Sequence, residues 1–492
     1  MALIEISHLS FTYEGSFEPV FEDLSLQLDT EWRLGLIGRN GRGKTTLLRL
    51  LLGEGRYTGT ISAPEPFDYF PFDVPDPEAE GQTVAETLRP ELEEWRLIKE
   101  LRLLGLEEEV LYRPFSTLSH GERTRFLLAL LFLRDCRFFL IDEPTDHLDA
   151  AGRALVGDYL ARKKGFLLVS HDRAFLDRCI DHVLAFQPTG LVVQKGNFST
   201  WWEEQTSREA SERSAQERLK KDIRRLEEAA RRTADWSDAV ERTKYASRNS
   251  GLRPDRGYVG HKAAKLMRRS KAVEERRQAA VAEKSSLLRD AEEAETLKLN
   301  TLTPPQQKVL EVRDLFIDYG AGLVCTGLTF TVERGDRVAL RGANGAGKSS
   351  LLKLLLGQDI PHTGQVWRSG GLTVSVLPQD TAFLRGKLND FIRESGAEEA
   401  LFKAILRKLG FPRSQFDQPL EAYSAGQKKK VLLAQSLCET AHLYIWDEPL
   451  NYVDIYTRMQ MEELLLAHRP TMVFVEHDQA FTDKVATKVI EL

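Results

Sequence analysis

The feature that most constrains the fold is an internal repeat of domain size in this chain of 492 residues. The glycine-rich segment Gly38–Thr45 returns as Gly342–Ser349, 304 residues later. An Asp-Glu-Pro sequence at Asp142 returns 305 residues later, and a His-Asp pair at His171 returns after 306. Chance similarity does not keep several motifs in nearly constant register, so we expect two copies of one domain. One domain of about 100 to 200 residues would also be too short for this chain.

The region between the two copies has a different composition. Neither glycine nor proline occurs from Phe198 to Ser250 or from His261 to Thr303, and apolar residues recur at helical spacing in both stretches. Glycines and prolines between the stretches predict a turn. We therefore expect an α/β domain over 1–205, a long α-helical hairpin linker over 206–305 and a second α/β domain over 306–492.

The charge of the linker differs from that of the rest of the chain, whose overall net charge is −6. Residues 206–305 hold 24 Lys and Arg against 17 Asp and Glu, and residues 242–277 hold 12 against 3. Charged helices are often simply solvated, but solvation alone would mix the signs evenly. We expect the basic tip to bind a polyanion, and the candidates for this contact are Arg242, Lys244, Arg248, Arg253, Arg256, Lys262, Lys265, Arg268, Arg269 and Lys271.

Both glycine-rich segments fit G-x-x-x-x-G-K-[ST], and each lies between an apolar predicted strand (34–37 or 338–340) and a leucine-rich predicted helix. In this context the backbone N–H groups and the helix N-terminus hold phosphate oxygens, while the lysine reaches the outer phosphates. The sequence therefore predicts two ATP sites. Their candidate residues are Gly38, Asn40, Gly41, Gly43, Lys44, Thr45 and Thr46 in the first copy, and Gly342, Asn344, Gly345, Gly347, Lys348, Ser349 and Ser350 in the second.

Each Asp-Glu-Pro sequence directly follows an apolar run of the kind that a buried parallel strand requires. The glutamates, Glu143 and Glu448, are placed where a general base could act on water near the outer phosphate. The hydroxyl group of each glycine loop and the aspartate that precedes each of these glutamates are suitable ligands for Mg²⁺. The metal-ligand candidates are Thr45, Asp142, Ser349 and Asp447.

Two further segments, Ser119–Glu122 and Ser424–Gln427, lie 23 residues before these aspartates and are expected to be helix N-caps. They also resemble the LSGGQ signature of ABC-type ATPases, and Thr145–Asp149 and Asn451–Asp454 resemble the D-loops of that family. Two such domains in one chain, joined by 100 helical residues, resemble the ABC-F proteins.

The resemblance implies P-loop ATPase domains in tandem, with each ATP between the glycine loop of one domain and the signature of the other. It adds the signature residues Ser119, Gly121, Ser424 and Gly426 to the ATP-binding candidates. The catalytic candidates become Glu143, Glu448, Gln379, His171 and His477. The two histidines resemble the switch histidine of that family, and Gln379 would also ligate the metal. The cofactors implied are ATP and Mg²⁺.

Some positions are ambiguous or depart from the family pattern. Tyr13 and Tyr319 resemble the aromatic residue that stacks on adenine, but they could equally belong to the core. Phe72 stands where the matching sequence of the second domain has Gln379, which predicts that the first site is the poorer ATPase. The signatures and switches also depart from the pattern at His120, Tyr423 and Glu476.

ABC-F proteins act on ribosomes, and in that family the linker enters the exit-tRNA site toward the P-site tRNA and the peptidyl-transferase centre. Several segments, such as Lys265–Lys271, look most like the Lsa-type antibiotic-resistance branch. The resemblance thus implies a ribosome partner (23S rRNA and P-site tRNA), which makes the ten basic candidates of the linker RNA-binding candidates. It also implies protection from lincosamide, streptogramin A and pleuromutilin antibiotics, driven by ATP binding and hydrolysis.

Three other functions share the nucleotide motifs: an ABC-F translation factor without a resistance role, the ATPase subunit of a membrane transporter, and a DNA-maintenance ATPase. A transporter subunit has no use for a basic hairpin, and the four cysteines form no zinc pattern. The longest apolar run, Phe126–Leu133, is far shorter than the roughly 20 residues that span a bilayer. We expect a cytoplasmic monomer without a stable membrane partner.

Overall fold

The computed structural model describes residues 2–14, 19–134, 138–146, 148–187, 190–211, scattered positions from 214 to 228, 297–319, 323–343, 345–412 and 415–492. The chain divides into two compact units, Met1–Trp201 with Thr296–Leu492, and Trp202–Glu295. The first unit is described below. Most of the predicted hairpin, including all ten RNA-binding candidates, lies outside the described residues.

Each copy of the repeat contains a mainly parallel sheet. In the first copy the strands are β3 (Arg33–Ile37), β5 (Asp68–Phe70), β6 (Phe139–Asp142), β7 (Phe166–Val169), β8 (His182–Gln187) and β9 (Gly190–Lys195), in the order β5-β6-β7-β3-β8-β9. In the second they are β12 (Arg337–Arg341), β14 (Val374–Leu377), β15 (Leu443–Asp447), β16 (Met472–Val475) and β17 (Lys488–Glu491), in the equivalent order β14-β15-β16-β12-β17. All pairs are parallel except β8–β9. The same strand order in both copies confirms the prediction of two domains with one fold.

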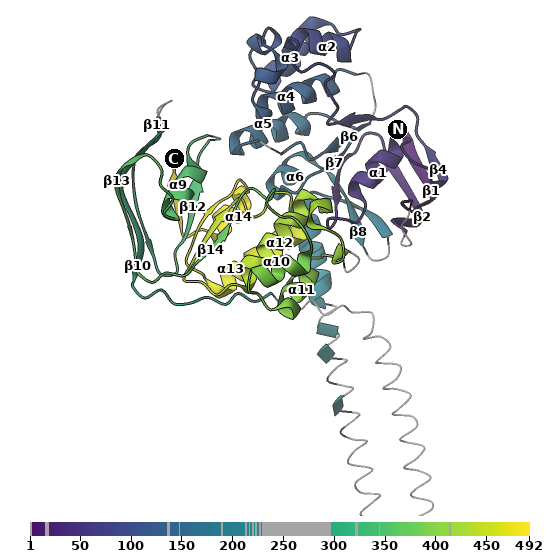
Figure 1. Ribbon diagram of the computed structural model, residues 1–492. Coiled ribbons are helices and arrows are strands. Elements are labelled where there is room, and N and C mark those ends of the chain that lie inside the picture. The colour runs from purple at the N-terminus through teal and green to yellow at the C-terminus, as the bar shows by residue number, and fades with distance from the viewer. Residues whose placement is uncertain are drawn as a thin grey trace, which may run out of the picture. The chain divides into compact units, whose positions relative to one another are not determined.

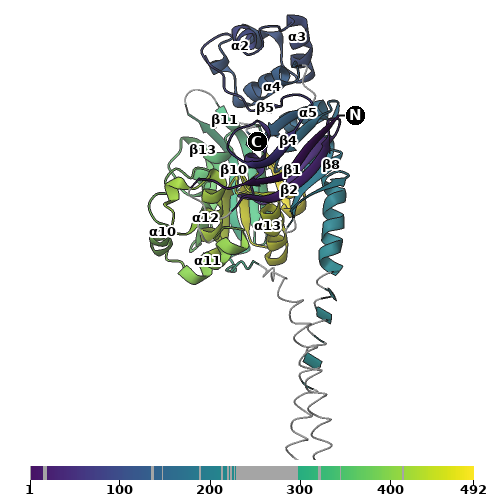
Figure 2. The same cartoon turned by 90° about the vertical axis from the view of Figure 1, so that its right-hand side faces the viewer.

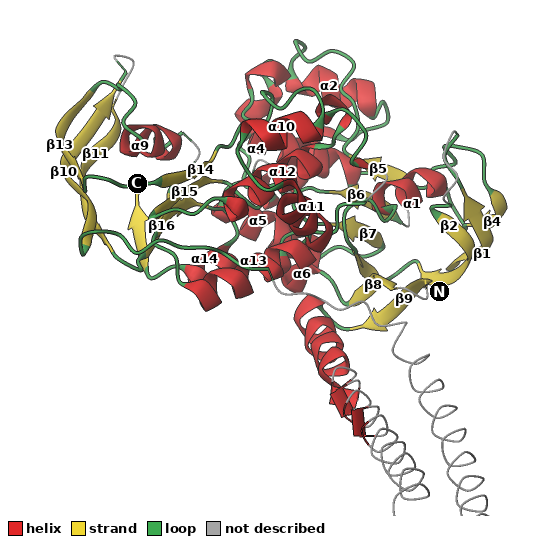
Figure 3. Cartoon of the chain, turned by 60° about the horizontal axis from the view of Figure 1, so that its bottom comes forward, coloured by secondary structure: helices red, strands yellow, loops and turns green. Residues whose placement is uncertain are grey.

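A smaller antiparallel sheet lies on the outer side of each glycine-loop helix. These sheets are β2-β1-β4, from β1 (Leu3–Phe11), β2 (Phe21–Asp29) and β4 (Thr58–Ser62), and β11-β10-β13, from β10 (Lys308–Asp318), β11 (Leu323–Glu333) and β13 (His362–Arg368). Helices α1 (Lys44–Leu51) and α9 (Lys348–Leu355) each lie between the two sheets of their domain (Figure 3). Their leucines, such as Leu47 and Leu351, are buried in cores that include residues of both sheets. This packing fixes each glycine loop at the end of a buried strand.

The remaining helices cover the other parts of each domain. Three helices of each domain lie away from its small sheet (Figures 1 and 2). In the first domain they are α2 (Gly81–Leu88), α3 (Glu94–Leu103) and α4 (His120–Leu131), and in the second they are α10 (Leu388–Glu394), α11 (Glu399–Lys408) and α12 (Ala425–Cys438). The helices that follow the Asp-Glu-Pro strands and the switch histidines are α5 (Ala150–Ala161), α6 (Arg173–Cys179), α13 (Ile455–His468) and α14 (Gln479–Val485). Short 3₁₀ turns occupy Glu108–Leu111, Phe115–Thr117 and Leu420–Ala422.

The two signature segments begin helices as predicted. The Ser119 hydroxyl accepts a hydrogen bond from the backbone N–H of Glu122, whose carboxylate accepts one from the N–H of Ser119. Ser424 and Gln427 form the same reciprocal pair at the start of α12. These capping boxes satisfy backbone donors that a helix start would otherwise leave unpaired. In the described part of the chain, no helix combines the length and apolar character needed to cross a membrane.

Candidate ATP sites

The glycine loops have the geometry of phosphate-binding loops. Gly43 and Gly347, which directly precede α1 and α9, have φ values of 97° and 87°, in the left-handed region that glycine tolerates best. Lys44 Nζ donates to the Gly38 carbonyl at 2.8 Å, and Lys348 Nζ donates to the Gly342 carbonyl at the same distance. Burial lowers the pKa of both lysines, although nearby carboxylates oppose the shift. Each ammonium group is thus held inside its own loop.

The predicted metal ligands lie together at the start of each helix. Thr45 Oγ1 donates to Asp142 Oδ2 at 3.0 Å, and Ser349 hydrogen-bonds Asp447 in the second domain. Oδ1 of Asp447 is buried and has no hydrogen-bond partner. An unpartnered buried carboxylate oxygen is costly unless a ligand completes it, and Mg²⁺ prefers oxygen ligands. The donor set therefore fits the metal ion that accompanies ATP.

The two glutamates share an unusual backbone conformation. Glu143 has φ 48° and Glu448 has φ 47°, in the left-handed region that residues other than glycine seldom adopt. The backbone N–H of each glutamate donates a hydrogen bond to a carbonyl of the neighbouring strand, that of Val169 or Val475. Such strain persists only where the surrounding structure imposes it, and it is concentrated at functional sites.

The side chains of the two glutamates have different neighbours. Glu448 accepts hydrogen bonds from Gln379 Nε2 at 2.7 Å, from the Asn451 amide and from the His477 ring at 3.3 Å. Burial favours the neutral acid, but His477, Gln379 and the nearby charge of Lys429 outweigh it and lower the pKa of Glu448. The Glu448 carboxylate is therefore ionised and fixed in place.

Glu143 has fewer partners. Its Oε2 accepts the backbone N–H of His171 at 3.3 Å, whereas its Oε1 lies 3.2 Å from His171 Nε2 without the alignment of a hydrogen bond. Burial, with the nearby Asp146 and Asp142, raises the pKa of Glu143 to about 8. Burial and the cations Lys44 and Arg458 lower the pKa of His171 well below its usual value. The first site thus favours neutral forms where the second favours a carboxylate.

The first glycine loop contacts the second domain. Asn40 Nδ2 donates to the Tyr452 carbonyl in the D-loop at 2.9 Å. A Cβ on the signature residue Gly426 would lie 3.0 Å from Asn40 Nδ2 and 2.3 Å from the Tyr452 carbonyl oxygen, so only glycine fits there. The glycine loop of the first domain and the signature of the second domain therefore lie in contact. The matching residue of loop two, Asn344, lies outside the described residues, so the pairing of that loop with Ser119 and Gly121 stays a prediction.

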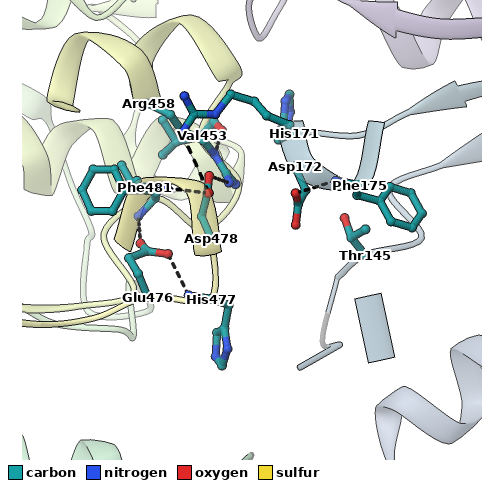
Figure 4. Close-up of polar contacts among 12 residues, drawn as sticks. Thr145, His171, Asp172, Phe175, Val453, Arg458, Glu476, His477, Asp478 and Phe481 are labelled. Carbon is teal, nitrogen blue, oxygen red and sulfur yellow. Dashed lines mark hydrogen bonds and ion pairs between the residues drawn. The ribbon is translucent and has the colours of Figure 1, made fainter. Parts of the chain in front are cut away.

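The segments after the switch histidines form a buried ionic cluster between the domains (Figure 4). Asp478 accepts from the Arg458 guanidinium at 3.1 Å and lies 3.9 Å from Arg173 of the first domain. Arg173 also pairs with Glu462 on α13. All four side chains are at most 10% exposed, where ions need partners. The cluster connects the residues that follow His171 to those that follow His477.

Glu476, which departs from the family pattern, also has a defined role in the fold. Its carboxylate accepts the backbone N–H of Leu450 in the D-loop region at 2.7 Å and that of His477 at 3.1 Å. In the first domain the Ser170 hydroxyl, 3.2 Å from Thr145 Oγ1, makes the equivalent connection. Figure 4 shows Glu476 with its contact to His477, and Thr145 in the first domain. The departure therefore keeps a connection between the switch and the D-loop.

The two tyrosines are not core residues. Tyr13 is 49% exposed and Tyr319 is 51% exposed, which contradicts the alternative that they pack inside. The Tyr13 hydroxyl lies 2.7 Å from Thr46 Oγ1, and the Tyr319 hydroxyl donates to Ser350 Oγ at 3.0 Å. Each ring thus stands next to the helix that follows its glycine loop, where an adenine could reach it.

Three residues of the sites were missed by the sequence analysis. Tyr69 donates its hydroxyl to Asp142 Oδ2 at 3.3 Å. Lys429 is buried on α12 and donates to the carbonyls of Pro378 and Asp447 at 3.0 and 3.1 Å. Arg458 lies between the switch segments. The signal for Lys429 and Arg458 in the sequence was weak, because a charged residue in a helix usually faces solvent. There was no signal for Tyr69.

Comparisons with known proteins agree with this geometry. The family model described as "ABC transporter" matches residues 21–146 and again residues 325–451. The two matches together cover slightly more than half of the chain and contain both glycine loops, both signatures and both Asp-Glu-Pro sequences.

Several curated proteins are similar along nearly the whole chain. The ribosome protection protein VmlR of Bacillus subtilis is 28% identical over 488 residues, 96% of this chain and 84% of that protein. The ATP-binding protein Uup of Caulobacter vibrioides is 29% identical over 96% of this chain and 75% of its own length. The energy-dependent translational throttle protein EttA of Haemophilus influenzae is 24% identical over 96% and 89%.

Among solved structures, the archaeal ribosome recycling factor aABCE1, in complex with the stalk protein aP1, has a TM-score of 0.59 at 21% identity. The match covers 94% of this chain and 83% of that chain, and it supports the fold of two tandem ATPase domains. The chain belongs to the ABC transporter family, whose ATP-hydrolysing domain it carries twice in tandem, and its similarity to VmlR, Uup and EttA places it in the ABC-F branch.

Proposed function

We propose that this ATP hydrolase is a cytoplasmic, ribosome-associated ABC-F protein that binds the exit-tRNA site and protects the ribosome from antibiotics of the peptidyl-transferase centre. The observation that carries the proposal is the similarity to VmlR, a named ribosome protection protein, along 96% of the chain. The similarity includes the linker, which no membrane-transport ATPase needs. Lincosamides, streptogramin A compounds and pleuromutilins are the drug classes proposed.

The basic linker supports an RNA partner. Residues 242–277 carry 12 Lys and Arg against 3 Asp and Glu, although the chain as a whole has a net charge of −6. Clustered cations bind RNA backbones by releasing counterions, and aromatic residues such as Trp236 and Tyr245 can stack on unpaired bases. The partners proposed are 23S rRNA and the P-site tRNA, contacted by one monomer.

The roles proposed at the ATP sites follow from the geometry. The glycine loops with Lys44 and Lys348 hold the phosphates, and Mg²⁺, near Thr45–Asp142 and Ser349–Asp447, would neutralise charge on the outer phosphates. The glutamates act on the attacking water as general bases. In site two, Gln379 and His477 hold the Glu448 carboxylate in place for that step.

Contacts between the domains suggest how ATP could act as a switch. Gly426 packs against Asn40, so a nucleotide on loop one would also face the signature of domain two. Binding energy from both domains then favours the closed arrangement, and hydrolysis removes it. A linker tip coupled to this change by about 1 to 3 kcal/mol would alter drug affinity roughly 5- to 150-fold.

The test is cell-free translation inhibited by a lincosamide or a pleuromutilin, with purified protein and ATP added. Rescue by the intact chain, lost when residues 249–258 are replaced by a short Gly-Ser turn, is the expected result. The replaced variant should keep its ATPase activity, which shows that its domains still fold. Absence of rescue with every drug of these classes would reject the protection role.

A translation factor without a resistance role is the second candidate, and the similarity to EttA over 96% of the chain favours it. It predicts that the protein changes the rate of drug-free translation in an ATP-dependent way. The same assay without drug therefore separates the two candidates.

A further inference from the structure

The strand register shows which residues correspond in the two ATP sites. On β5, Phe70 pairs with Ile141, the residue before Asp142; on β14, Leu377 pairs with Trp446, the residue before Asp447. Counting along each strand, Tyr69 therefore corresponds to Val376 and Phe72 corresponds to Gln379.

The second site obtains its polar contact from Gln379. The side-chain amide donates to Glu448 Oε2 at 2.7 Å. Phe72 has no donor or acceptor in its side chain. Its ring instead lies 5.7 Å from the Arg89 guanidinium carbon, and Arg89 is paired with Asp68. Phe72 is thus engaged in a cation–π contact with Arg89 and contributes no polar group to site one.

The first site obtains a polar contact from Tyr69 instead. The hydroxyl donates to Asp142 Oδ2 at 3.3 Å, and this same oxygen accepts the hydroxyl of Thr45 at 3.0 Å. Val376, the residue in this register of the second domain, is 38% exposed and carries no donor. The Asp142 carboxylate is therefore oriented from two sides, by the glycine-loop helix and by β5.

We propose that Tyr69 is a positioning residue of the first ATP site, whose hydroxyl orients Asp142 toward the magnesium ion that would accompany the nucleotide. The inference rests on the proposed roles of Thr45 and Asp142 at Mg²⁺. Hydrogen-bond partners of metal-site carboxylates hold them in the ligating orientation, and losing one commonly weakens metal affinity 10- to 100-fold. The metal-site aspartate of the first site thus has a support that Val376 cannot give in the second site.

The test measures nucleotide affinity and its dependence on Mg²⁺, not turnover. In a Glu143→Gln, Lys348→Ala background, a fluorescent ATP analogue should report the first site alone, without hydrolysis. Tyr69→Phe should raise the Mg²⁺ concentration for half-maximal binding about 10-fold. Affinity measured in EDTA should change less than about twofold, because no metal then depends on Asp142.

Two controls separate this role from a general effect. Tyr112→Phe removes the hydroxyl of a tyrosine that is 60% exposed and should leave the Mg²⁺ dependence unchanged. In the reciprocal background, Lys44→Ala with Glu448→Gln, Tyr69→Phe should have no effect. An unchanged Mg²⁺ dependence, or an equal loss in EDTA, would overturn the role of Tyr69. Loss of nucleotide binding in Lys44→Ala, Lys348→Ala tests the ATP sites themselves and is independent of that result.

Discussion

The glutamates proposed as general bases have the same backbone strain but unequal support. Three side chains hydrogen-bond Glu448, whereas Glu143 accepts a single backbone N–H. A general base must be ionised and held within reach of its water. Glu448 has a lowered pKa and three contacts that hold it, whereas Glu143 has a raised pKa and one.

We therefore predict that Glu448→Gln lowers steady-state ATP turnover more than Glu143→Gln does. The expected difference is about 10-fold, which is less than the roughly 100- to 10,000-fold that one positioned acid–base group contributes in full. Phosphate release by each single variant and by the double variant is the measurement. Equal losses, or a larger loss in Glu143→Gln, would show that the side-chain contacts of Glu448 do not set the rate.

Single-residue roles were predicted where a motif fixes the spacing. Thr45 and Asp142 are 97 residues apart, yet a glycine loop and an Asp-Glu-Pro strand predicted that they would meet, and they are hydrogen-bonded. Tyr69 could not be found in this way, because its partner depends on how β5 pairs with β6 and not on any local pattern. For the same reason, Phe72 was interpreted only as the loss of a glutamine.

Helices α6 and α13 carry the ion pair between Arg173 and Glu462, which joins the two domains. The internal repeat does not predict this pair. Arg173 corresponds to Gln479 and Glu462 corresponds to Gly157, so the pair occurs once although the helices occur twice. Glu462 also pairs with Lys484 at 3.0 Å. Because these side chains are buried, removing one partner leaves an uncompensated charge.

Arg173→Met should lower the free energy of unfolding by about 3 kcal/mol, and Glu462→Gln added to it should cost less than the sum of the two single changes. Urea denaturation of the four proteins of this cycle is the measurement. Arg178→Met on the same helix is the control, because Arg178 is 44% exposed beside Asp158 and should cost less than about 1 kcal/mol. Strictly additive losses would mean that the two residues are not coupled.

Regular elements around the motifs were largely predicted. The apolar runs at 34–37 and 338–340 are strands β3 and β12, and the leucine-rich runs that follow the glycine loops are α1 and α9. The small antiparallel sheets were not predicted as sheets. Their strands are interrupted by bulges and leave one side half exposed, as in β1, so their hydrophobic pattern is weak.

At the scale of the whole molecule, the linker should contact RNA mainly through charge. Reversing Arg268, Arg269 and Lys271 to Glu should lower ribosome affinity and flatten the slope of log K against log salt by about 2, since each lost phosphate contact removes about 0.7 to 0.9. The matched control reverses Lys221, Arg224 and Arg225, which lie in a stretch of mixed sign. If both triple variants show the parent slope, the basic tip does not bind the phosphates.

If ATP binding drives this chain onto ribosomes, the bound nucleotide decides whether the chain co-sediments with them, and the Glu143→Gln, Glu448→Gln variant isolates that step. This variant should bind ATP, remain closed and fail to hydrolyse, so we predict that it pellets with 70S ribosomes in ATP and stays in the supernatant in ADP. A variant that remains in the supernatant in ATP, or pellets with membrane vesicles instead of ribosomes, would contradict the account.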